Sequence, residues 1–94
     1  MARLTMALNN KEYYIVDYEK VRHDVSGYSG EAVNKLAKFE NFFDDLTAEQ
    51  SKISEELEKL RGQGKTRSYK FKELMAKKLT NSNVLNLLKT YGLE

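Results

Sequence analysis

The feature of this sequence that most constrains its fold is a long stripe of apolar residues spaced for one face of an α-helix. The stripe steps by four and three residues without a change of phase from Ala32 to Leu60. This spacing predicts an amphipathic helix over residues 31–61. The positions, of which only Gln50 is polar, are Ala32, Leu36, Phe39, Phe43, Leu46, Gln50, Ile53, Leu57 and Leu60.

A competing signal lies in the middle of this stripe. Residues 47–50, Thr-Ala-Glu-Gln, have the form of a capping box, which would begin a new helix at Ala48. The phase of the stripe continues across Thr47, and the chain contains no proline to interrupt a long helix. We therefore expect one helix, with the basic residue Arg61 in its last turn and Gly62 after its end.

The residues before the stripe predict a β-hairpin and then a short helix. Apolar residues alternate along residues 3–9, and β-branched and aromatic residues follow in 11–17, with Asn9-Asn10 suited to the turn between them. Asp17 is placed to cap a short helix from Tyr18 to about Ser26.

Two short helices are expected at the C-terminus, over about 68–79 and 83–91. The polar residues 80–82 separate them, and Gly92 ends the second. The predicted fold is therefore mainly α, of the α+β class. It is a single domain over residues 1–94 with an N-terminal β-hairpin, a short helix, one long amphipathic helix and two short C-terminal helices.

The long helix also predicts a surface for a partner. About 30 helical residues extend roughly 45 Å, whereas a globule of this size is about 26 Å across. The short C-terminal helices cannot cover the whole stripe, so we expect a second copy or a partner helix to cover part of it. The expected partner-binding residues are Leu36, Phe39, Phe43, Leu46, Ile53, Leu57 and Leu60.

Charge is segregated along the chain although the net charge is only +2. Residues 31–60 carry a net charge of -4, and residues 61–79 carry +6. The basic segment can pair with the acidic helix, dock two chains head to tail, or contact an anion or nucleic acid. Its basic residues are Arg61, Lys65, Arg67, Lys70, Lys72, Lys77 and Lys78.

Composition argues against most enzyme chemistry. Cysteine is absent, which excludes disulfides, thiolate metal sites and thiol nucleophiles. A single histidine makes histidine-based zinc sites and Ser-His-Asp catalysis improbable. We expect a non-enzymatic protein with no cofactor and no metal. Because there is neither an export signal nor an apolar membrane span, we expect a cytoplasmic location without membrane contact.

The N-terminal region resembles a known family. A short strand, an asparagine turn, then Lys11-Glu12-Tyr13 in a second strand that leads into a helix is similar to the start of small tail assembly chaperones of long-tailed phages and prophages. The similarity covers roughly residues 3–26. It implies a protein that self-associates and coats a hydrophobic tape-measure protein until the tail tube polymerises around it. It identifies no individual functional residue.

The sequence thus predicts a protein-interaction or assembly factor that forms a homo-oligomer. In this hypothesis, the apolar stripe and the hairpin bind segments of partner proteins, such as a tape-measure-like protein. The alternative is a nucleic-acid-binding accessory protein that uses the basic segment 61–78.

Overall fold

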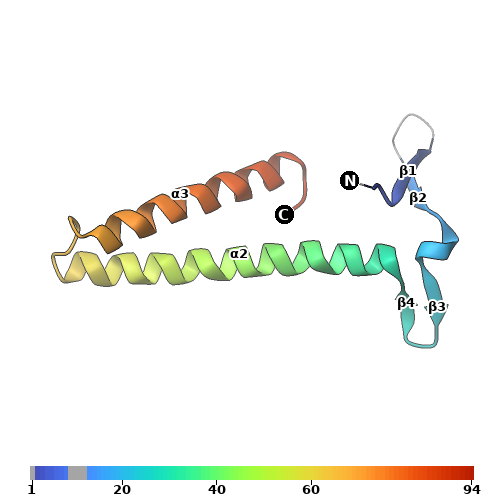
Figure 1. Cartoon of the computed structure of the whole chain (residues 1–94), viewed down its shortest axis with the longest axis horizontal. Coiled ribbons are helices and arrows are strands. Elements are labelled where there is room, and N and C mark those ends of the chain that lie inside the picture. The colour runs from blue at the N-terminus through green and yellow to red at the C-terminus, as the bar shows by residue number, and fades with distance from the viewer. Residues whose placement is uncertain (1, 9–12) are drawn as a thin grey trace. The chain divides into compact units, whose positions relative to one another are not determined.

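The computed structural model describes residues 2–8 and 13–94 and assigns the chain to the α+β class (Figure 1). The chain divides into two compact units, residues 1–41 and 42–94. Two β-hairpins lie in the first unit, and a helical hairpin forms the second. The long helix α2 begins in the first unit and ends in the second.

The first hairpin consists of β1 (Thr5–Leu8) and β2 (Tyr13–Val16), which pair antiparallel. Both strands lie within the segments that the sequence predicts. The register places Thr5 opposite Val16 and Leu8 opposite Tyr13. The predicted turn at Asn9-Asn10 lies outside the described residues.

The predicted helix from Tyr18 to about Ser26 is wrong. A single 3₁₀ turn, η1 (Tyr18–Lys20), is followed by a second antiparallel hairpin of β3 (Arg22–Asp24) and β4 (Gly27–Ser29). The Asp24 carboxylate accepts a hydrogen bond from the Ser26 backbone N–H at 2.7 Å, and Gly27 has a φ of 131°. This local turn chemistry outweighs the helical spacing of only three apolar residues, Tyr18, Val21 and Val25.

Helix α2 spans Glu31–Gly62 without interruption, so the capping box does not begin a new helix. The Thr47 hydroxyl instead donates to the Phe43 carbonyl oxygen at 2.9 Å. This bond to the preceding turn of the same helix is a usual arrangement for threonine inside a helix.

One helix, α3 (Tyr69–Thr90), replaces the two short C-terminal helices, so the predicted break at residues 80–82 is wrong. The Ser68 hydroxyl caps its start by accepting from the Phe71 backbone N–H at 3.1 Å. Asn81 and Ser82 stay helical because their side chains find partners on α2. Thr80 donates to the Ala76 carbonyl oxygen, Asn81 to the Glu49 carboxylate, and Ser82 accepts from Gln50.

The core lies between α2 and α3 in the second unit. Figure 1 shows α3 returning beside the part of α2 that belongs to this unit. Leu57 is fully buried, and the half-buried Phe71 packs against the cluster. Burying a leucine side chain stabilises a fold by about 1.5–3 kcal/mol. The buried apolar residues of the described chain are Ile53, Leu57, Leu60 and Leu74.

Candidate functional site

The β1–β2 hairpin presents one face made of large apolar side chains. Met6 lies opposite Ile15, and Leu8 lies opposite Tyr13. Cross-strand partners and residues two apart along a strand share a face of the sheet. All four side chains are exposed, by 42–67%. We call Met6, Leu8, Tyr13 and Ile15 the hairpin face.

This hairpin also has open edges. Its sheet contains β1 and β2 alone, so in the described part of the chain neither outer edge is paired with a third strand. Unpaired backbone N–H and C=O groups on a sheet edge are templates for another extended segment. A two-stranded hairpin without further packing is marginally stable in water. The hairpin therefore combines apolar side chains with available backbone hydrogen-bonding groups.

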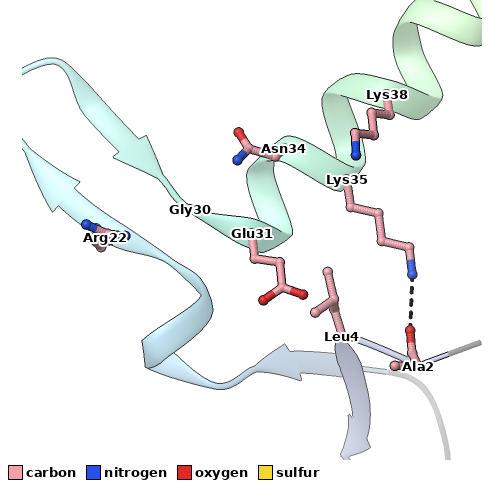
Figure 2. Close-up of a pocket in the computed structure, with 8 residues that line it drawn as sticks. All are labelled: Ala2, Leu4, Arg22, Gly30, Glu31, Asn34, Lys35 and Lys38. Atoms are coloured by element: carbon pink, nitrogen blue, oxygen red, sulfur yellow. Dashed lines mark hydrogen bonds between the residues drawn. The ribbon is translucent and has the colours of Figure 1, made fainter.

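A cavity of about 530 Å³ lies in the first unit (Figure 2). The residues that immediately precede β1 and the first turns of α2 contribute to its walls. Its lining residues are Ala2, Leu4, Arg22, Gly30, Glu31, Asn34, Lys35 and Lys38. Three of these side chains are basic and one is acidic.

The charges of this cavity favour an anionic ligand. The Glu31 carboxylate accepts a hydrogen bond from the Lys20 ammonium group at 3.0 Å, and this interaction raises the pKa of Lys20 above its ordinary value. The Lys35 ammonium group donates a hydrogen bond to the Ala2 carbonyl oxygen at 3.5 Å. Figure 2 marks this bond with a dashed line. Arg22 and Lys38 form no ion pair with any residue that the structure describes. The cavity thus keeps positive charge that can attract a carboxylate or another anion.

Gly30 connects β4 to α2 and shapes one wall of the cavity. Its φ is 124°, and a Cβ atom at this position would lie 2.5 Å from the Lys20 carbonyl oxygen. A side chain here is excluded both by the backbone conformation and by this close approach. Glycine is therefore required for α2 to begin beside η1.

The predicted partner-binding stripe has three different environments along α2. Ile53, Leu57 and Leu60 are buried in the core with Leu74 of α3. Phe39, Phe43 and Leu46 are half-buried. Leu36 is exposed. The structure therefore places the C-terminal part of the stripe inside the helical hairpin.

A polar layer interrupts the core of the helical hairpin. The Gln50 amide nitrogen donates to the Ser82 hydroxyl at 3.1 Å and to the Lys78 carbonyl oxygen at 3.2 Å. Asn81, which is buried, donates to the Glu49 carboxylate at 2.9 Å. This bond and the Lys77 ammonium group, 3.4 Å from the same carboxylate, hold the pKa of Glu49 below its ordinary value.

Some residues of the predicted basic segment form contacts within the folded chain, and others are exposed without an ion pair to any described residue. Arg61 pairs with Glu58 at 3.0 Å and lies over the Phe71 ring, and Lys77 pairs with Glu49. Lys78 is half-buried. The remaining four are exposed and form no ion pair within residues 2–8 and 13–94. These four are Lys65, Arg67, Lys70 and Lys72.

The basic cavity was not predicted from the sequence. Its residues come from three separate parts of the first 38 positions, and none of these parts carries a binding motif. The hairpin face was partly visible in the sequence, since Met6 and Leu8 alternate along the predicted strand. The pairing of these residues with Tyr13 and Ile15 depends on the register of the two strands.

Within the described residues, no cluster of histidine and acidic side chains could hold a metal ion. Neither α2 nor α3 combines the length and the hydropathy that crossing a membrane requires. No protein-family model, curated protein or solved structure matches this chain.

Proposed function

We propose that this chain is a non-enzymatic protein-interaction factor that binds an extended apolar segment of another protein through the β1–β2 hairpin. The observation that carries the proposal is the hairpin face, where four large apolar side chains are exposed on a sheet of two strands. Such a face is stabilised when apolar side chains from a partner cover it.

An extended segment suits both properties of the hairpin. It can add a strand to an open edge through backbone hydrogen bonds, while its alternate side chains contact Met6 and Ile15. Ala2 and Leu4 precede β1 and line the basic cavity. A segment with apolar residues and a nearby acidic residue therefore matches the chemistry of the first unit.

The resemblance of residues 3–26 to tail assembly chaperones, of which the structure has the two strands but not the short helix, suggests one class of partner. A tape-measure-like protein presents apolar segments that must be covered before assembly. In this proposal, the hairpin face holds such a segment until the partner's own assembly displaces it. The apolar residue Leu36, which is exposed on α2, offers an additional contact.

Binding to an array of ten-residue peptides tests the proposal. One set of peptides alternates apolar residues with threonine, and the comparison set alternates lysine with threonine. We expect selective binding of the apolar set. Met6→Thr combined with Ile15→Thr should weaken this binding about tenfold, since it removes apolar contact while retaining strand-forming residues. Ala7→Thr, on the opposite face of β1, is the matched control. Equal binding by all three proteins would contradict the proposal.

A second candidate function is nucleic-acid binding by the basic segment. The observation that favours it is a run of exposed basic residues that form no ion pair with any described residue. These residues are Lys65, Arg67, Lys70 and Lys72. Affinity for a short DNA duplex should then fall steeply with salt, because bound counterions are released. Apolar peptide binding by the hairpin should change little over the same range.

A further inference from the structure

We propose that the basic cavity of the first unit is a carboxylate site, which holds an acidic group of the extended segment that the hairpin binds. In this site, Arg22, Asn34 and Lys38 contact the carboxylate. The inference rests on the proposed function and deepens it, because it adds a chemical requirement to the partner. It is carried by a cavity whose cations form no ion pair with any residue that the structure describes.

One face of α2 forms a wall of this cavity. Four lining residues belong to the first two turns of the helix, and their spacing of three and four positions places them on the same side of it. Arg22 on β3 and Leu4 on the N-terminal segment line the cavity from outside this helix, as Figure 2 shows. Three segments of the first unit therefore contribute to the site. The four residues of α2 are Glu31, Asn34, Lys35 and Lys38.

The acidic residue of the cavity does not cancel its positive charge. Glu31 pairs at 3.0 Å with Lys20, which lies outside the lining, so its charge is already compensated. Lys35 donates to a backbone carbonyl oxygen, which is neutral, and so keeps its full charge. Arg22 and Lys38 form no ion pair with other described residues. Three positive charges are thus left to attract an anion into the cavity.

The free donors of the cavity suit a carboxylate. The planar guanidinium group of Arg22 matches the two oxygen atoms of a carboxylate, and Lys38 adds a further charged donor. The side-chain amide of Asn34 has no hydrogen-bond partner among the described residues. All three side chains are exposed. They can therefore bind a carboxylate without breaking an ion pair or side-chain hydrogen bond of the described chain.

The size and lining of the cavity favour a carboxylate that belongs to a larger molecule. Its volume of about 530 Å³ falls within the range of about 300–1,000 Å³ that is usual for ligand pockets. A single carboxylate fills only part of this space. Ala2 and Leu4 add apolar surface to the lining. An acidic residue with apolar neighbours therefore fits the cavity better than an inorganic anion does.

The cavity lies next to the first residue of the hairpin. Leu4, which lines it, immediately precedes Thr5, where β1 begins. An extended chain advances about 3.3 Å per residue. A segment that follows β1 past Thr5 therefore reaches the cavity lining within one or two residues. The carboxylate belongs at the end of the segment that passes Thr5, and not at the end that passes Leu8.

Calorimetric titration of the full chain with four versions of one apolar peptide from the array tests the inference. Three versions are acetylated and amidated: one has glutamine at both ends, and the other two replace either the first or the last glutamine by glutamate. The fourth has glutamine at both ends and a free C-terminal carboxylate, so it distinguishes a chain end from an acidic side chain as the source of the carboxylate.

We expect one of the two glutamate peptides to bind about fivefold more tightly than the glutamine peptide at low salt. Which end carries the effective glutamate reports whether the segment runs parallel or antiparallel to β1. The gain in affinity should shrink as NaCl increases from about 0.05 to 0.5 M, because salt screens exposed charges.

Two double variants make the test specific. Arg22→Gln with Lys38→Gln should remove the gain and leave the affinity for the glutamine peptide unchanged. Lys65→Gln with Arg67→Gln is the matched control, because it removes the same charge at exposed positions of the second unit. In NMR spectra, the side-chain amide signals of Asn34 should shift when the glutamate peptide binds and not when the glutamine peptide binds.

The outcomes separate this inference from the proposed function. Equal affinity for the glutamate and glutamine peptides would overturn the inference alone. A gain that persists in Arg22→Gln/Lys38→Gln would overturn it too, since the carboxylate would then bind elsewhere. If inorganic phosphate alone shifted the Asn34 signals as strongly as the glutamate peptide, the cavity would instead be a phosphate site. Failure of every peptide to bind would overturn the proposed function together with the inference.

Discussion

The two units of this protein bury apolar side chains to different degrees. In the second unit, α2 and α3 enclose Leu57 and its neighbours between them. In the first unit, the β1–β2 hairpin leaves Met6 and Ile15 exposed. A helix needs only one neighbour to cover a stripe, whereas a sheet of two strands has two faces and two edges to cover. The second unit thus supplies its own core, whereas the first leaves an apolar surface exposed, and we propose that a partner covers it.

Truncating the core should affect stability far more than altering the hairpin face. Leu57→Ala leaves a cavity beside Leu60 and Leu74 and should lower the free energy of unfolding by about 2–5 kcal/mol. Met6→Thr removes a side chain that is already exposed and should change it by about 0.5 kcal/mol or less. Urea denaturation followed by helical circular dichroism measures both. Similar losses in the two variants would contradict the contrast between the units.

The first unit should nevertheless depend on one backbone position. Gly30→Ala introduces a Cβ atom 2.5 Å from the Lys20 carbonyl oxygen at a φ of 124°. We expect a destabilisation of about 1–3 kcal/mol, confined to the hairpins and the start of α2. Amide exchange resolved by residue would locate the loss. Gly62→Ala is the control, because nothing lies within 4 Å of a Cβ atom at that position.

The polar layer should make the second unit sensitive to acid. The folded chain holds the pKa of Glu49 below its ordinary value of 4.5, mainly through the hydrogen bond from Asn81. The stabilisation is therefore fully present above pH 4.5 and is lost as the pH falls through the lower, folded pKa. Melting temperatures across this range should decline less in Glu49→Gln than in the wild type. If the melting temperatures of the two proteins declined equally with falling pH, the hydrogen bonds of Glu49 would not contribute to the stability of the second unit.

The smallest expected effect concerns the middle of α3. Thr80 is exposed and its hydroxyl only donates to the Ala76 carbonyl oxygen. Since alanine is the better helix former, Thr80→Ala should raise the stability of the second unit by about 0.5 kcal/mol. The melting temperature reports this change. A clear loss would indicate that Thr80 supports the helix through its hydroxyl.

The long helix was predictable because its signal is local and repeated. Nine positions in one phase define α2 almost to the residue, and Gly62 lies at its end. The strand segments of the first hairpin were predictable from alternation for the same reason. In both cases, many residues carry the same pattern, so one conflicting signal such as Thr47 does not change the outcome.

The errors arise where contacts distant in sequence, or single turns, decide the structure. Residues 80–82 look like a break, but Glu49 and Gln50, about thirty positions earlier, satisfy Asn81 and Ser82 within the helix. In the segment from Tyr18 to Ser26, one aspartate turn and Gly27 outweigh helical spacing. The basic residues of the segment 61–78 were visible in the sequence. That Lys65 and Arg67 form no ion pair with other described residues could be learned only from the folded structure.

Hydrogen exchange of backbone amides, resolved by residue on the full chain, tests the contrast between the two units most directly. Exchange reports the free energy of local opening. We predict strong protection at Ile53, Leu57 and Leu60 and weak protection along β1 and β2, with the strands becoming protected when an apolar peptide from the array is added. Equal protection of β1–β2 and the core in the free protein would contradict the account, because the hairpin would then need no partner.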